Sequence, residues 1–433
     1  MAEVEVKNKV ADTYLFHYLF YNIMEEKVNI TRQIAPDIHW VGVNDRRLQR
    51  FENMFPLPQG VAYNSYLITG EKTILLDTVD SSVRDQFIEN VAYVLGNRSL
   101  DYLVINHMEP DHCGNIEAIV RSYPNVKVIG NAKTFQFFSQ YYAMDLSNHA
   151  IEVSDGQLLD FGSHKLRFYF APMVHWPEVM FCVEEHNGIL FSADAFGSFG
   201  TLPGTLFSDE LDFDTLFLAE TRRYYSNIVG RFGSQVHSVL QKLPLDTITM
   251  IAPLHGPLHR KEYVSRVLEL HKTWSLYAPE QKGVVLAYAS MYQNTEQAVE
   301  ALAFKLGELG VKEMRIYDVS NTHPSYIIAD IFKYSHLVLG APTYNMNLYL
   351  PMEALLKELQ VLNLQNRHVA IIANHSWASA AKKGLNQLVG AMKNITMIEP
   401  QLDIRSTLKR NQMEQLDSLA QAIADSLNSP DAP

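Results

Sequence analysis

The sequence predicts an α/β protein in which an αββα sandwich is followed by a doubly wound parallel sheet. From residue 34 to about 251, short strands separated by turn residues dominate, with helices between some of them. After residue 279, strands and helices alternate regularly, which is typical of a parallel sheet with helices on both faces. The chain has 433 residues, too many for one ordinary core. We therefore expect an N-terminal helical extension (1–33), a sandwich domain (34–279) and a parallel-sheet domain (280–433).

The first two segments contain the following elements in order. An aromatic-rich helical stretch, Tyr14–Tyr21, is expected to pack onto the body or onto a partner subunit. Apolar and β-branched runs bounded by turn residues predict the strands that follow. They are Ile38–Val43, Tyr63–Ile68, Thr73–Asp77, Tyr102–Ile105, Lys127–Ile129, Lys165–Phe170, Val179–Val183, Gly188–Ser192 and Thr247–Ile251. Helices are expected between the strands Thr73–Asp77 and Tyr102–Ile105, from residue 115 to about 122, and over Phe213–Leu243.

The third segment is expected to begin near Pro279, where the pattern changes to regular alternation. Its predicted strands are Val284–Ala289, Met314–Asp318, His336–Gly340 and His368–Ala373. Its predicted helices are Thr295–Leu309, Tyr326–Phe332, Pro351–Leu362 and Ala381–Met392. The tail Asn428–Pro433 is expected to fray.

Composition excludes several classes of function. The net charge of −12 argues against a nucleic acid or an anionic membrane as partner. The two cysteines, Cys113 and Cys182, form no Cys-x-x-Cys pair, so no zinc ribbon, iron–sulfur cluster or rubredoxin-type site is expected. We see no signal-peptide pattern and no apolar run of about 18 residues. A cytoplasmic location is therefore expected.

Four residues with metal-binding side chains lie within six positions, directly after the predicted strand Tyr102–Ile105: His107, Glu109, Asp111 and His112. Loops at the carboxyl ends of strands usually carry the chemistry of α/β proteins. Imidazole and carboxylate together suit a divalent transition metal. The alternative interpretation, a solvated polar turn, is weakened by the density of ligand-type residues.

Three later residues follow buried strands in the same way: His175, Asp194 and His255. With the first cluster they make four imidazoles and three carboxylates. A single metal ion would leave several of these groups buried without a partner, which is costly. Two metal ions with one bridging carboxylate fit this inventory.

The seven-residue pattern resembles that of the flavodiiron proteins, also called A-type flavoproteins, and the resemblance covers nearly the whole chain from about Ile34. It implies a metallo-β-lactamase fold for the N-terminal domain and a flavodoxin-like fold for the second. It also implies two iron ions per chain: His107, Glu109 and His175 would bind one, Asp111, His112 and His255 the other, and Asp194 would bridge them. Zinc hydrolases of the same fold carry a second imidazole where this chain has Glu109, and oxygen-rich sites favour iron or manganese.

Three loops at strand ends resemble the FMN-binding loops of flavodoxins. The first follows the strand Val284–Ala289 and precedes a helix, an arrangement that binds phosphate well. Where flavodoxins commonly have Gly, this chain has Gln293, which puts the backbone geometry there in question. The FMN contacts implied by the resemblance are Ser290, Met291, Tyr292, Gln293, Asn294, Thr295, Pro342, Thr343, Tyr344, Asn345, Ser376, Trp377 and Ala378. Tyr344 and Trp377 are expected to stack on the flavin ring or border it. The alternative is that these aromatic side chains simply close the loops.

Additional catalytic candidates are Glu52 and Tyr225, with Tyr224 as its neighbour. Glu52 comes just before the Pro56–Pro58 loop, at a position where this family often places a residue close to the irons. Ordinary loop or core packing is the alternative for all three. His259 lies one helical turn from His255 and is a candidate for supporting the metal site. The remaining histidines have no ligand spacing.

The resemblance implies reduction of O₂ to water, of NO to N₂O, or of both, with FMN as the source of electrons. A zinc hydrolase fused to a flavodoxin-like electron carrier is the alternative, and a pure electron-transfer module is a third. Because no rubredoxin or flavin-reductase module follows Pro433, a separate electron donor such as rubredoxin or a reductase is expected. The resemblance also implies a head-to-tail homodimer, or a dimer of such dimers.

Overall fold

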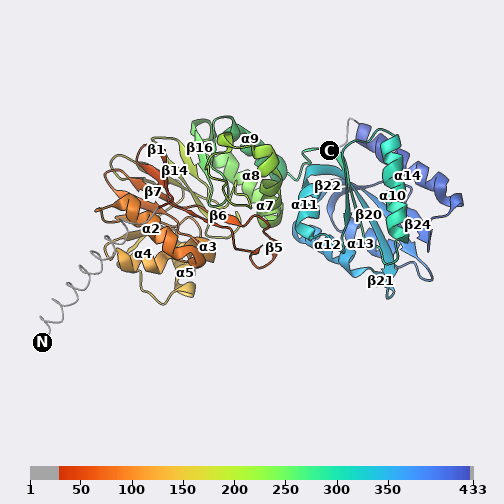
Figure 1. Ribbon diagram of the computed structural model, residues 1–433, viewed down its shortest axis with the longest axis horizontal. Coiled ribbons are helices and arrows are strands. Elements are labelled where there is room, and N and C mark those ends of the chain that lie inside the picture. The colour runs from red at the N-terminus through yellow and green to blue at the C-terminus, as the bar shows by residue number, and fades with distance from the viewer. Residues whose placement is uncertain (1–28, 430–433) are drawn as a thin grey trace, which may run out of the picture. The chain divides into compact units, whose positions relative to one another are not determined.

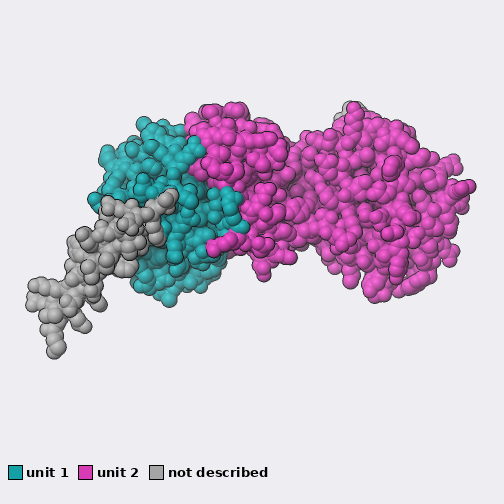
Figure 2. All heavy atoms as spheres, in the orientation of Figure 1, with its two compact units in different colours: residues 1–46, 62–170, 178–193 teal, residues 47–61, 171–177, 194–433 magenta. Residues whose placement is uncertain are grey.

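The computed structural model describes residues 29–429 (Figure 1). The predicted helix Tyr14–Tyr21 lies outside the described residues, as does most of the predicted extension at 1–33. Across residues 29–429, no helix combines the length and hydrophobicity needed to cross a membrane. The chain divides into two compact units, which Figure 2 colours separately. The first holds described residues up to Arg46, Ala62–Phe170 and Glu178–Ala193, and the second holds Arg47–Val61, Ala171–Pro177 and the chain from Asp194 onward.

A seven-stranded sheet forms much of the first unit. Its strands are, in spatial order, β1 (Arg32–Ala35), β2 (Ile38–Trp40), β7 (Tyr66–Thr69), β8 (Thr73–Leu76), β9 (Tyr102–Val104), β10 (Lys127–Gly130) and β11 (Ala150–Glu152). Strands β1 to β8 pair antiparallel, and β8 to β11 pair parallel. The parallel connections run through α2 (Arg84–Leu95), α4 (Ile116–Ser122) and α5 (Ala132–Tyr141). The carboxyl ends of β8, β9 and β10 therefore lie at one edge of this sheet.

A second, six-stranded sheet has the order β12 (Leu158–Asp160), β13 (Lys165–Phe170), β14 (Met180–Glu184), β15 (Ile189–Phe191), β16 (Met250–Ala252) and β17 (His259–Arg260). Strands β12 to β15 pair antiparallel in order, as do β16 and β17, and every residue of β14, β15 and β16 is buried. The predicted strand Thr247–Ile251 begins too early, because residues Leu245–Thr247 form a 3₁₀ turn. There the hydroxyl of Thr247 donates to the carbonyl of Pro244 at 2.8 Å, a local bond that competes with a strand.

The helical stretch predicted over Phe213–Leu243 is present but interrupted. It consists of α6 (Phe213–Leu216), α7 (Leu218–Tyr224), a π-helical turn η3 (Tyr225–Val229), a 3₁₀ turn η4 (Gly230–Phe232) and α8 (Gly233–Lys242). The 3₁₀ turn begins at Gly230 and is followed directly by Gly233, and glycine has low helix propensity. Helix α9 (Glu262–Ser275) follows β17 and is not among the predicted helices.

The third sheet is parallel throughout its main path, as predicted. Its order is β19 (Met314–Asp318), β18 (Gln281–Tyr288), β20 (Tyr334–Tyr344), β22 (Gln365–His375) and β23 (Lys393–Met397), which is the doubly wound order 2-1-3-4-5. A short strand, β24 (Leu402–Arg405), also pairs parallel with β22. Figure 1 shows α10 (Asn294–Glu308) and α14 (Met413–Asn428) on one face. It shows α11 (Pro324–Lys333), α12 (Leu350–Val361) and α13 (Ala381–Gly390) on the other.

One face of this parallel sheet forms a core with α10 and α14. Alternate residues of β18, Val284 and Leu286, are fully buried there against Leu302 of α10 and Leu419 of α14. Their spacing of two matches the alternation of side chains in a strand. Helix α14 was not predicted, although its buried leucines recur at helical spacing.

The segment around the predicted domain boundary at residue 279 is held by buried polar groups of the second unit. Glu280 accepts a bidentate pair of hydrogen bonds from Arg222 of α7 and a third from the indole of Trp274. The fully buried guanidinium of Arg367 donates to the carbonyl of Tyr277 at 2.7 Å. Burial lowers the pKa of Arg367 to about 9. These contacts fix the path of the chain into β18, while the boundary itself stays a prediction.

Two stacked histidines at the amino ends of neighbouring strands predict an acid-sensitive stability. His336 is buried, its ring lies 4.7 Å from that of His368, and the hydroxyl of Ser426 is 3.0 Å from both rings. Burial, with smaller contributions from His368 and Lys282, lowers the pKa of His336 to about 3. In the unfolded chain His336 takes up a proton below its ordinary pKa of about 6.5, whereas in the folded chain it stays neutral down to about pH 3. The free energy of unfolding is therefore highest above pH 6.5 and falls as the pH falls towards 3.

Because of His336, we expect the free energy of unfolding to fall by as much as about 1.4 kcal/mol for each pH unit as the pH is lowered from 6 to 4. Urea unfolding curves at several pH values measure this slope. In His336→Gln the slope should be smaller, because no imidazole is left to take up the proton. His237→Gln, at a half-buried position on α8, is the control and should keep the wild-type slope. Equal slopes in wild type and His336→Gln would contradict the assignment.

Candidate metal centre and flavin site

The first four metal-binding residues lie directly after β9, as predicted. His107 and Glu109 occupy the loop, whereas Asp111 and His112 belong to a short helix, α3 (Pro110–Cys113), which begins at Pro110. All four side chains are buried. The His107 Nε2 lies 3.2 Å from a Glu109 oxygen, and the rings of His107 and His112 stack at 5.7 Å.

Two buried carboxylates that are not among the predicted site residues, Asp77 and Glu178, orient this loop. Asp77, at the end of β8, accepts hydrogen bonds from the backbone N–H groups of Asn106 (2.7 Å) and His107 (3.1 Å). Glu178 accepts from the Nδ1 of His107 at 2.7 Å and from the N–H of Met108 at 2.8 Å. Burial disfavours the charged form of Glu178, but these hydrogen bonds outweigh it and hold its pKa below the ordinary value. A carboxylate that accepts a hydrogen bond from one ring nitrogen of a histidine fixes the orientation of the ring and leaves the other nitrogen unprotonated, so that it can bind a metal.

The remaining three residues follow strands of the second sheet. His175 comes after β13, Asp194 after β15 and His255 after β16. The two carboxylate oxygens of Asp194 face different histidines: Oδ2 lies 3.0 Å from His175 Nε2, and Oδ1 lies 3.6 Å from His255 Nε2. Asp194 and His255 are completely buried.

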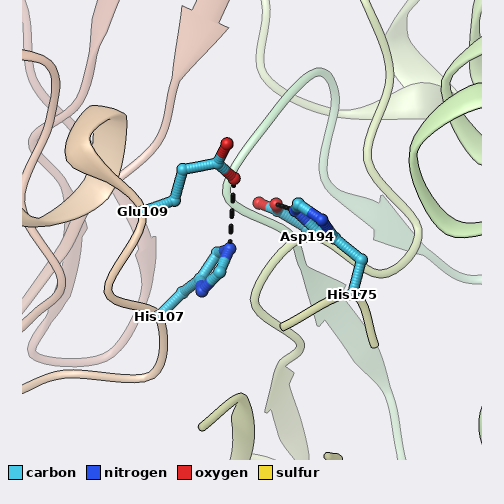
Figure 3. Close-up of side chains that lie close together, drawn as sticks. All are labelled: His107, Glu109, His175 and Asp194. Carbon is cyan, nitrogen blue, oxygen red and sulfur yellow. Dashed lines mark hydrogen bonds and ion pairs between the residues drawn. The ribbon is translucent and has the colours of Figure 1, made fainter. Parts of the chain in front are cut away.

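The seven predicted residues form two groups. The ligand atoms of His107, Glu109, His175 and Asp194 lie within 4.8 Å of one another, and Figure 3 shows these four side chains converging. Asp111, His112 and His255 form a second group by the same measure. Each group offers both imidazole nitrogen and carboxylate oxygen, the mixture that suits iron or manganese. The residues therefore fit two metal ions, and the bridging role of Asp194 stays a prediction.

The other catalytic candidates lie in different surroundings. Glu52 is exposed at the turn of the hairpin formed by β4 (Arg50–Phe51) and β5 (Phe55–Pro56). The ring of Tyr224 lies 5.4 Å from that of His255, so Tyr224 borders the site. Tyr225 is buried 5.1 Å from the rings of His271 and Trp274. Catalytic roles for Glu52 and Tyr225 stay predictions, and of the two tyrosines Tyr224 is the one in contact with a predicted ligand.

The three predicted FMN loops lie at the carboxyl ends of three neighbouring parallel strands, β18, β20 and β22. The first loop leads into the 15-residue helix α10, whose amino-terminal N–H groups suit a phosphate. In the second, where the sequence predicts only a loop, β20 extends to Tyr344 and forms a hairpin with β21 (Asn347–Leu348). Tyr344 and Trp377 are 39% and 74% exposed, which leaves ring faces available to a flavin. These loops fit FMN.

Gln293 adopts the backbone conformation that glycine commonly serves in such loops. Its φ is +65°, in the left-handed region, directly before α10. A left-handed conformation destabilises a non-glycine residue by about 1–2 kcal/mol. Substitution by glycine would remove this strain, but the greater flexibility of glycine in the unfolded chain would offset about half of the gain. Gln293→Gly is therefore expected to raise stability by up to about 1 kcal/mol and to retain FMN.

Gln297→Gly is a matched control, because Gln297 is also exposed but lies inside α10. That substitution should lower stability by about 1 kcal/mol. Urea midpoints and the FMN dissociation constant measure both effects. Equal destabilisation by the two substitutions would show that Gln293 is not strained.

Comparisons with known proteins agree with this geometry. Residues 61–256 match the family described as ODP family beta lactamase. The chain is 31% identical over 360 residues to an anaerobic nitric oxide reductase flavorubredoxin of Vibrio vulnificus, covering 81% of this chain and 71% of that protein. It is 31% identical over 371 residues to a nitric oxide reductase of Moorella thermoacetica, covering 85% of this chain and 91% of that protein. Among solved structures, rubredoxin oxygen:oxidoreductase from Desulfovibrio gigas superposes with a TM-score of 0.85 at 26% identity, covering 92% and 98% of the two chains. The flavodiiron protein from Giardia intestinalis shares the fold at 22% identity, with a TM-score of 0.83 and coverage of 93% and 100%.

These matches confirm the predicted fold class. A β-lactamase-type domain occupies the N-terminal part, and the parallel sheet that follows is flavodoxin-like.

Proposed function

Because the chain belongs to the flavodiiron protein family and is an oxidoreductase, we propose that it reduces O₂ to water, NO to N₂O, or both, at a di-iron centre supplied with electrons by FMN. The placement of Asp194 carries the proposal, since its two oxygens face histidines that belong to separate ligand groups. The zinc-hydrolase alternative has less support. Glu109 replaces an imidazole, and the relatives described above are reductases.

The bound cofactors would supply the redox chemistry, two electrons for each pair of NO molecules or four for each O₂. The chain's own residues keep the metal-binding groups in place. Glu178 orients His107, and Asp77 holds the backbone at the start of the ligand loop. Negative charge from Glu109, Asp111 and Asp194 suits cations in a buried site.

Aromatic side chains line one side of the site and limit access of water to it. The rings of Phe51 and Tyr224 lie 5.2 Å and 5.4 Å from the ring of His255, and Phe199 packs against both at 5.5 Å and 5.0 Å. All three are buried. Exclusion of water strengthens the electrostatic interactions inside such a site and suppresses side reactions.

The proposed partners follow from the family. We propose that the working unit is a head-to-tail homodimer, or a dimer of such dimers, and that a separate donor such as rubredoxin or a reductase delivers electrons. The small molecules O₂ and NO are the proposed substrates.

Stopped-flow spectroscopy of the anaerobically reduced protein tests the function. Mixing with O₂ or NO should reoxidise the flavin rapidly with at least one gas, and purified protein should carry two irons per chain. His107→Ala, which removes a ligand but no flavin contact, should reoxidise far more slowly. Protein that is active as isolated with zinc and no iron, or reduced iron-loaded protein that reacts with neither gas, would overturn the proposal.

A further inference from the structure

Two buried histidines bind both backbone polar groups of Phe196, two residues after Asp194. The Nε2 of His259 donates to the carbonyl of Phe196 at 3.1 Å. The N–H of Phe196 donates to the Nε2 of His271 at 3.1 Å. The ring of Phe196 also packs on that of His271 at 4.2 Å. Both histidines lie within the core of the second unit, with at most 2% exposure.

The contacts of each ring require opposite tautomers. A carbonyl only accepts, so the Nε2 of His259 carries the proton, and its Nδ1 accepts from the hydroxyl of Ser208 at 2.7 Å. The Nε2 of His271 must be unprotonated to accept from Phe196, and its Nδ1 donates to the carbonyl of Val267 at 2.9 Å. Burial is the main cause that lowers the pKa values of His259 and His271, to about 4 and about 3, which is consistent with two neutral rings.

The backbone that these rings hold is strained. Phe196 has a φ of +67° and Ala193 a φ of +48°, so residues in the left-handed region lie on both sides of Asp194. The turn closes through a hydrogen bond from Gly197 N to Asp194 O at 3.1 Å. A side chain at Gly197 would lie 2.9 Å from that carbonyl and 3.4 Å from the Cβ of His255. Such conformations persist when surrounding contacts impose them.

We call the two hydrogen bonds that join His259 and His271 to Phe196 the clamp. The clamp also connects two of the predicted metal ligands, Asp194 and His255. His255, His259 and His271 belong to one continuous segment, which runs from the end of β16 through β17 into α9. By holding Phe196, this segment ties the Asp194 turn to the strand that presents His255. Asp194 Oδ1 and His255 Nε2, which lie on the two elements joined in this way, are 3.6 Å apart.

We propose that His259 and His271 are positioning residues that hold Asp194 in place to bridge two metal ions. The inference rests on the proposed di-iron function and assigns these two histidines no direct contact with metal or substrate. They act by imposing the left-handed conformation of Phe196.

Paired amide substitutions separate this role from simple packing. A glutamine amide reaches the position of an imidazole Nε2, whereas an asparagine amide reaches that of Nδ1. His259→Gln and His271→Gln can therefore keep the bond to Phe196. His259→Asn and His271→Asn keep only the bonds to Ser208 and Val267. His336→Asn is the control, since it alters an equally buried histidine in the parallel-sheet domain.

Three measurements follow. In metal-free protein, hydrogen–deuterium exchange of residues 193–197 should be at least tenfold faster in the two Asn variants than in the Gln variants. After anaerobic loading, the Asn variants should bind ferrous iron with about ten- to hundredfold lower affinity, the loss typical of removing support from a metal ligand. Mössbauer spectra of the iron that they retain should show weakened magnetic coupling. The Gln variants and His336→Asn should remain close to wild type.

Asn variants that match the Gln variants in exchange, iron affinity and Mössbauer spectrum would overturn the inference. So would a loss of iron in His336→Asn as large as in the Asn variants, since that would indicate general destabilisation. Wild-type protein that takes up no iron would overturn the proposed function instead, and the exchange comparison would then decide whether the clamp holds the turn.

Discussion

Asp194→Ala protein is expected to lose both metal ions and all measurable gas reduction. The two oxygens of Asp194 face His175 and His255, which belong to different ligand groups. Removing the carboxylate should therefore weaken both metal positions, whereas His112→Ala should mainly weaken one. Loss of a mere hydrogen-bond partner of a ligand costs about ten- to hundredfold in affinity, so loss of a bridging ligand should exceed about a hundredfold. Iron analysis after gel filtration, with stopped-flow turnover, measures the effect.

Two variants control this experiment. Asp194→Asn keeps the size of the side chain but offers only one oxygen, so we expect it to retain less iron than wild type and more than Asp194→Ala. Glu184→Ala removes another fully buried carboxylate, one that holds His164 and Asn187, and should leave the iron content unchanged. Full iron and full turnover in Asp194→Ala would show that Asp194 does not bridge the metals.

Mixed dimers are expected to recover activity from two inactive chains. One chain carries His107→Ala and lacks a complete metal site, and the other carries Thr295→Ala and Asn345→Ala in the flavin loops. In a head-to-tail dimer the intact flavin of the first chain meets the intact metal site of the second. Each mixed dimer then has one working pair out of two and about half the wild-type turnover. Co-expression with two affinity tags and tandem purification isolates the mixed dimers.

A reciprocal pairing makes the outcome unambiguous. A chain carrying all three substitutions is combined with a wild-type chain. If electrons pass between subunits, each intact site in this dimer faces a disabled partner and turnover should vanish. If electrons pass within one chain, the dimer of wild-type and triply substituted chains should have about half the wild-type turnover. The mixed dimer of the two inactive chains should then have none. That second pattern would rule out the head-to-tail arrangement.

The sequence by itself determined where the candidate chemistry lies. Each of His107, His175, Asp194 and His255 is a polar residue that follows a short apolar run. Strands and the loops after them are local features, so their positions can be read from a few neighbouring residues. The same holds for Ser290 to Thr295, between a buried strand and a helix. The sequence also marks Gln293 as a position to check, because flavodoxins commonly have glycine there and glycine often serves a left-handed conformation. The structure places Gln293 in that conformation.

The contacts among these positions were decided by tertiary structure alone. Glu178 lies 71 residues from His107 yet binds its ring, and no spacing in the sequence marks it as that ring's partner. Tyr224 and Tyr225 are adjacent, but the helix directs one towards His255 and the other towards His271.

In the sequence His271 has no ligand spacing, and His259 is a candidate only because of its distance from His255 along the chain. Their joint hold on Phe196 arises because β17, α9 and the turn after β15 fold into one core. The physical reason is that hydrophobic burial brings distant elements together without direction, whereas hydrogen bonds between buried polar groups then select specific partners. The pattern of apolar residues in the sequence indicates which segments will be buried, but it does not indicate which buried polar groups will become hydrogen-bond partners.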